Sequence, residues 1–114
     1  EIDKDGNKST RVVGSNYEVV AGSNYVNVKG DVNLTIDTNC NTYIKGDWNI
    51  QVDGSKTEVV TGAVSETYKD TKTETVTGAV SETYEANQTT SITGTLDLDA
   101  SSEIDMDAGT INMN

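Results

Sequence analysis

The sequence contains no histidine, no proline and no phenylalanine, and it has a single cysteine, Cys40. One cysteine cannot form a disulfide within the chain, and without histidine neither a Ser-His-Asp site nor a Cys/His metal cluster can be built. A catalytic thiol also needs a histidine or another cation beside it, so we interpret Cys40 as a small buried residue. We therefore expect no metal and no cofactor.

Basic residues are scarce, with 8 Lys and Arg against 19 Asp and Glu, for a net charge of −11. Phosphate binding needs clustered Lys and Arg, so we expect no nucleic-acid partner and no electrostatic attraction to an anionic membrane. No signal peptide and no apolar run of membrane-spanning length is found. Paired carboxylates leave a glycosidase open by residue type alone. However, they recur with the repeat described below and no aromatic-rich insertion interrupts it, so we expect no enzymatic activity.

Large apolar residues are also few, with 23 Val, Ile and Leu among 114 residues. Together with the net charge, this composition lies at the edge of that expected for disorder, and it cannot build a conventional core. The chain also begins at Glu1 inside a repeating pattern, as a fragment of a longer protein would. We expect order to come from backbone pairing along a repeat and from other copies of the chain.

The repeat is marked by glycine, because nine of the ten glycines are separated by multiples of eight residues. A fixed period of this kind is typical of solenoids and arrays. Thr38, Asp70 and Ala86 occupy the positions where the glycine is missing. A short polar residue usually follows, so each position is expected to be a corner with unusual φ and ψ angles. This glycine row consists of Gly6, Gly14, Gly22, Gly30, Gly46, Gly54, Gly62, Gly78 and Gly94.

A second row lies two residues before the first and consists of β-branched residues. Alternation along a strand places both rows on one face, which we expect to point inward. Tyr68 and Tyr84 are the exceptions, and both precede a position without glycine. The unit V-x-G-[S/D/N]-x-x-x-x thus predicts six residues of strand and two of corner, forming one face of a prism. The inward row consists of Val12, Val20, Val28, Ile36, Ile44, Val52, Val60, Val76 and Ile92.

Residues 55–94 contain a duplication, with TGAVSETY at 61–68 and again at 77–84. Here charged residues fall on the same side of the strand as the inward row, which we call the inward phase. Burying an unpaired carboxylate there is very costly. A wide, hydrated lumen, pairing of Glu with Lys between neighbouring levels, or a local change of strand direction would each accommodate them. The residues concerned are Lys56, Glu58, Glu66, Lys72, Glu74 and Glu82.

Residues 95–114 differ from the preceding repeats. Apolar and acidic residues alternate as far as Asp107, and no charged residue follows it. The glycine-rich calcium repeat is absent, so the acidic side is interpreted as a solvated face. The phase shifts by one residue at Gly109, after which Ile111 and Met113 carry the apolar positions. Interface cores are depleted of charge and open strand edges need a cover, so this end is a predicted docking level for a partner; completion of the fold is the alternative. The docking level consists of Gly109, Thr110, Ile111, Asn112, Met113 and Asn114.

The number of chains follows from the long period. A single-chain solenoid with three octads per coil would show a 24-residue modulation, whereas the visible long repeat is 16 residues. Three intertwined chains require no 24-residue period, because successive octads on one face come from different chains. We therefore predict an all-β, intertwined triple-stranded β-helix, a homotrimeric β-prism solenoid, with a shaft at residues 1–94 and a C-terminal end at 95–114.

The octads, including GDVNLTI at 30–36 and GDWNIQV at 46–52, and the closing DAGTINMN resemble a known family. They are similar to the C-terminal needle of the central spike, or baseplate hub, of contractile-tailed phages and to VgrG, the spike of type VI secretion. The resemblance implies a homotrimer in the virion baseplate, or one secreted by a type VI system, that transmits contraction force and pierces an outer membrane. It also implies a PAAR-repeat tip protein at the C-terminal end, and the lack of histidine favours a blunt end that needs such a cap.

A binding module is the alternative from another class. Regular Thr residues such as Thr67, Thr75 and Thr83 on a flat face of a single-chain solenoid would suit ice or glycan binding.

Overall fold

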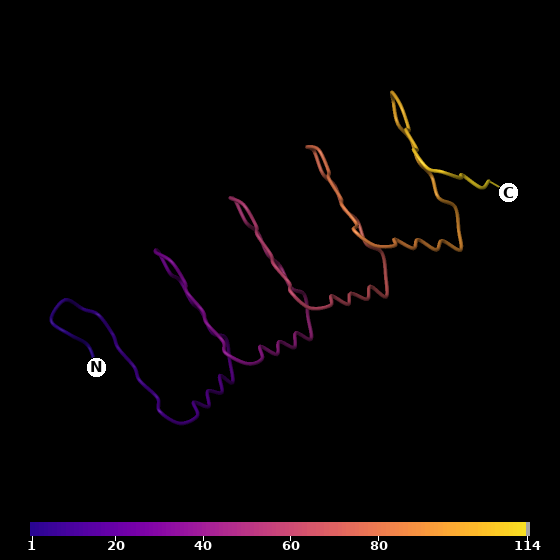
Figure 1. Ribbon diagram of the computed structural model, residues 1–114. Helices are drawn as coiled ribbons and strands as arrows, with labels where there is room; N and C mark the ends of the chain where they lie inside the picture. Colours follow the sequence, from indigo (N-terminus) through magenta and orange to yellow (C-terminus); the bar gives the residue numbers. More distant parts are fainter. Residues whose placement is uncertain (114) are drawn as a thin grey trace. The chain divides into compact units, whose positions relative to one another are not determined.

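The computed structural model describes residues 1–113, and in this range the chain is extended, without a helix or a continuous strand. Among the described residues there is one β-bridge, which is isolated and joins Ile2 to Lys8 in antiparallel orientation. The chain divides into two units, Glu1–Thr57 and Glu58–Asn114. In each unit, extended stretches alternate with changes of direction (Figure 1). The bends are therefore the elements from which the structure is built.

The bends recur every eight residues, with two bent residues followed by six extended ones. In every bend that contains a member of the glycine row from Gly14 onward, the glycine is the second bent residue. The spacing of the bends is thus the spacing of the glycines. The bends lie at 13–14, 21–22, 29–30, 37–38, 45–46 and 53–54 in the first unit, and at 61–62, 69–70, 77–78, 85–86, 93–94 and 101–102 in the second, where a single bent residue, Gly109, follows.

Bends also form where the glycine is missing, at Thr38, Asp70 and Ala86, and one forms at Ser102, eight residues after Gly94. At Asp70 the local reason is visible. Its Oδ1 accepts hydrogen bonds from the backbone N–H of Thr71, at 2.7 Å, and from the Thr71 hydroxyl, at 3.3 Å. A short polar side chain thus satisfies the backbone that the bend exposes. The bend at Ser102 was not among the sequence predictions.

In the single chain, one member of the glycine row, Gly6, has a positive φ, of 83°, and no other described residue does. A Cβ built on any of the glycines has no neighbouring atom within 4 Å, so crowding within the chain does not require glycine either. The other bends of the row form at negative φ, which every L-residue adopts. Ala86 accordingly occupies a bend without strain.

Gly6 belongs to a small hairpin at residues 1–9. The N–H of Gly6 donates to the Asp3 carbonyl at 3.1 Å, and the N–H of Asp3 donates to the Asn7 carbonyl at 2.9 Å. The N–H of Ser9 donates to the Glu1 carbonyl at 2.9 Å. A tight loop closed by one left-handed residue, usually glycine, is a common hairpin connection. Here the positive φ of Gly6 is what lets the chain reverse.

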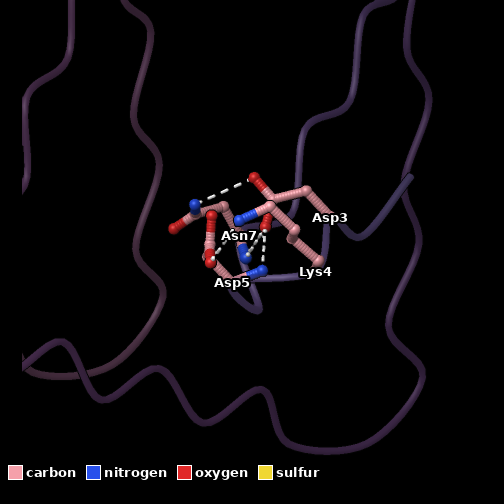
Figure 2. Close-up of polar contacts among 4 residues, drawn as sticks. All are labelled: Asp3, Lys4, Asp5 and Asn7. Carbon is pink, nitrogen blue, oxygen red and sulfur yellow. Dashed lines mark hydrogen bonds and ion pairs between the residues drawn. The ribbon is translucent and has the colours of Figure 1, made fainter.

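The carboxylate of Asp3 holds this loop together (Figure 2). Its Oδ1 accepts the backbone N–H groups of Asp5, at 3.0 Å, and Asn7, at 2.8 Å, and its Oδ2 accepts the Asn7 side-chain amide at 2.9 Å. The hydrogen bond from the Asn7 side chain, followed by those from the backbone, lowers the pKa of Asp3 below its ordinary value of 3.8. Lys4 and Asp5 form an ion pair at 3.3 Å whose two side chains are largely exposed. Hydrogen bonds to one ionised side chain thus add to the backbone hydrogen bonds that close the loop.

No residue among 1–113 is buried, so the described chain has no core of its own. Its accessible surface is 13266 Å² for a mass of 12.2 kDa. A folded monomer of this mass exposes about 6,000 Å². The surface is therefore about twice that of a globular protein of the same size.

Candidate functional site

The inward row is the most shielded set of large apolar residues in the described chain, apart from Ile111. Its nine members are 43–51% exposed, the extremes being Ile44 and Val52. Apolar residues of the opposite phase are far more open, as Tyr17 at 90% and Val19 at 93% show. Because side chains alternate along an extended segment, a bend shields one phase and opens the other. The shielded phase is the one that carries the inward row.

Tyr68 and Tyr84 stand at the inward-row position of two bends without glycine. Both take part in polar contacts on that phase. The Lys72 ammonium lies 5.2 Å from the centroid of the Tyr68 ring. The Tyr84 hydroxyl donates to Glu82 Oε2 at 3.5 Å. At these two positions, an aromatic ring thus contacts a charged side chain of the same phase.

Lys72 also pairs with Glu74, its Nζ lying 3.8 Å from Glu74 Oε2. Both side chains are more than half exposed, and a pair of this kind contributes little to stability. The geometry nevertheless shows that a lysine and a glutamate two residues apart reach one another on the inward phase. Pairing of such residues between levels stays a prediction.

The described part of the docking level is residues 109–113, and Asn114 lies outside the described residues. Gly109 stands where the first residue of each earlier bend stands, so the bends keep their period of eight. In the earlier bends the glycine is the second bent residue, so here it stands one residue earlier within the bend. Ile111 is 46% exposed and thus as shielded as the inward row. The inward row consists of even-numbered residues, so Ile111 takes the shielded position only after the shift of one residue at Gly109. Met113 is 85% exposed. One apolar side chain of the terminal level is therefore open.

The range of residues 1–113 holds no pocket and no group of three side chains placed to bind a metal ion. None of its residues belongs to a helix long and apolar enough to cross a membrane. Cys40, which the sequence predicted to be buried, is exposed in the single chain. The reason is that the chain provides no core in which a thiol could be buried.

The features that sequence reasoning missed are corner residues. Ser102 could have been found by continuing the count of eight beyond Gly94. The first residue of each bend was also overlooked, because it is neither glycine nor apolar in most repeats. Comparison with known proteins adds no relative: neither a family model, nor a curated protein, nor a solved structure matches this chain.

Proposed function

We propose that this chain is one of three identical strands of a rigid needle, an intertwined triple-stranded β-helix. The observation that carries the proposal is the bend every eight residues with the inward row on its shielded side. Three copies wound about a common axis would turn that side toward the axis. The nine Val and Ile residues of each chain would then meet their counterparts from the two other chains and form a continuous narrow core.

Surface area supports association. The chain exposes 13266 Å², about 7,000 Å² more than a folded monomer of its mass. A stable protein interface buries about 800 Å² on each partner, so the excess could supply several such interfaces. The extended segments between bends also leave backbone N–H and C=O groups that need partners once buried. Strands from neighbouring chains would provide them through regular ladders.

The mechanical function follows from this arrangement. On each face of the prism, an octad of one chain would lie about 4.8 Å from the next octad of a neighbouring chain. The whole repeat would give a rod about 65 Å long at that spacing. Backbone pairing that continues without a loop gives great resistance to unfolding. Such a rod suits transmission of contraction force and piercing of an outer membrane in a phage-tail baseplate or a VgrG-type spike, with a separate tip protein at the C-terminal end.

Two measurements test the proposal. Light scattering should give three times the chain mass of 12.2 kDa. The circular dichroism of the same sample should be unchanged by SDS at room temperature. A monomer mass would instead support a single-chain surface-binding module for glycan or ice. Rapid loss of structure in SDS would contradict a needle built from continuous strand pairing.

A further inference from the structure

Charged residues at the first position of successive bends alternate in sign. Lys29, Asp37, Lys45 and Asp53 occupy this position in four consecutive bends. The next charged residues at the same position, Lys69 and Glu85, continue the alternation. Val13 stands at the same position and is 90% exposed, and the charged residues are exposed as well. These charges are therefore open to solvent or to a neighbouring chain.

The alternation distinguishes between possible stackings of the repeat. A stacking offset of eight residues brings only opposite charges together, as in Lys29 with Asp37. An offset of 16 gives two like-charge pairs, including Lys29 with Lys45, beside two opposite-charge pairs. An offset of 24 gives one of each kind, Lys45 with Lys69 and Lys29 with Asp53. Like charges directly opposite one another in a sheet are destabilising, whereas opposite charges are favourable. The offset of eight is the one that creates no like-charge pair; Lys69 and Glu85 then lie beside threonines.

Residues at the same position of consecutive bends, eight apart, cannot meet within one chain. Six extended residues separate consecutive bends, a distance of about 20 Å. Accordingly, Lys29, Asp37 and Lys45 form no ion pair in the described chain, and Asp53 accepts a hydrogen bond from the Gln51 side chain at 2.8 Å. An offset of eight therefore requires a second copy of the chain.

We propose that Lys29, Asp37, Lys45 and Asp53 form an interchain charge ladder, in which each residue lies beside the residue eight positions away in a neighbouring copy. This inference rests on the proposed trimer and names the residues that hold its chains at the one-octad offset. The ladder favours a one-octad offset between neighbours and disfavours a two-octad offset. It thereby sets the order in which the three chains follow one another on each face.

The glutamates of the inward phase do not argue against this register. Glu58, Glu66, Glu74 and Glu82 would stack like charges at an offset of 8, 16 or 24 residues alike. Their repulsion is therefore common to every candidate register. The ion pair of Lys72 with Glu74, at 3.8 Å, also brings a compensating cation to that phase. The outer ladder is the series that separates one register from another.

Disulfide trapping tests the register directly. In a Cys40→Ser background, Lys29→Cys with Asp37→Cys places two thiols on adjacent levels, within the Cα separation of about 4.4–6.8 Å that a disulfide needs. We expect a covalent trimer after oxidation and boiling in SDS. Lys29→Cys with Lys45→Cys is the matched control, since its thiols would lie two levels, or about 9.6 Å, apart. The pair Lys29→Cys with Asp53→Cys tests for a single-chain coil with three octads per turn. In such a coil the two thiols would form a disulfide within one chain.

Charge reversal tests whether the ladder stabilises the trimer. Asp37→Lys converts both neighbouring pairs to like-charge pairs and should lower the dissociation temperature by at least about 4 °C. The variant Lys29→Asp, Asp37→Lys, Lys45→Asp, Asp53→Lys restores the alternation and should recover the loss. If the fourfold variant dissociated at a temperature as low as that of Asp37→Lys, the ladder would be overturned.

The two proposals fail in different ways. A trimer mass with no covalent trimer from the 29/37 pair, or with equal trapping of the 29/45 pair, would overturn the register and leave the needle standing. A monomer mass for the unmodified chain would overturn both.

Discussion

Val12 and Val13 are neighbours of the same residue type, yet Val12 is 50% exposed and Val13 is 90% exposed. The pair Val19 and Val20 differs in the same way, at 93% and 46%. Since the side chains are identical, the difference comes from position relative to the bend alone. In both pairs the shielded residue belongs to the inward row. The bend therefore gives the extended chain two unequal sides even before a partner is added.

Substitution on the two sides should have opposite consequences. In the proposed trimer, Val28→Asp places three carboxylates at one level of the axis. Each ionised group costs several kcal/mol to bury without a partner, and threefold symmetry multiplies the cost. We expect the trimer not to assemble, as measured by light scattering. Asn27→Asp, on the open phase, is the control and should assemble normally; equal tolerance of both changes would show that the inward phase is assigned wrongly.

Glycine should matter at Gly6 and little at the later bends. Gly6 has a φ of 83°, at which an L-residue with a Cβ is strained by about 1 kcal/mol or more. We expect Gly6→Ala to speed amide hydrogen exchange at Ser9, whose N–H closes the hairpin. Gly6→Asn should preserve most of the protection, because Asn tolerates the left-handed region.

The matched substitution at a later bend is Gly78→Ala. Ala86 already occupies the equivalent position one octad on, and a Cβ at Gly78 meets no atom of its own chain. We expect a change of no more than about 0.5 kcal/mol in stability, seen as a nearly unchanged dissociation temperature. A large loss would reveal close approach of another chain at this corner.

The hairpin should respond to acid through Asp3. Its pKa is lowered by the hydrogen bonds from Asn7 and the backbone, so the ionised form favours the folded loop. The stabilisation is present above the ordinary value of 3.8 and is lost as the pH falls through the lower folded pKa. Carbon-13 NMR of the Asp3 carboxyl should show this depressed titration. Asn7→Ala, which removes the first cause, should move the pKa back toward 3.8, and an unchanged titration would contradict the assignment.

A period of eight can be predicted from the sequence because spacing is a local property. In the single chain, the bends at Gly14 and Gly46 have that spacing. The sign of φ does not follow from glycine alone, since a bend can also form at negative φ; Gly6 has a positive φ where the chain reverses within a few residues. The burial of Cys40 could not be judged from one chain, because the proposed core is shared among chains. The docking level, the trimer and the tip partner stay predictions for the same reason.

The C-terminal end gives the last prediction. Ile111 is shielded to the same degree as the inward row, whereas Met113 is open, and no charged residue follows Asp107. In a trimer, three copies of this level would form a small apolar platform with unpaired strand edges, which a tip protein could cover through backbone hydrogen bonds and apolar contacts. Deleting residues 109–114 should therefore abolish binding of a PAAR-repeat tip protein in a pull-down assay.

The deletion should leave the trimer intact, because the bends and the inward row up to Ile92 are untouched. Light scattering of the shortened chain is the control for assembly. Met113→Asp offers a milder test in the full-length chain, since a charge on the platform would have to be buried beneath the tip. Tip binding at full strength by both the shortened chain and Met113→Asp would place the docking surface elsewhere on the needle.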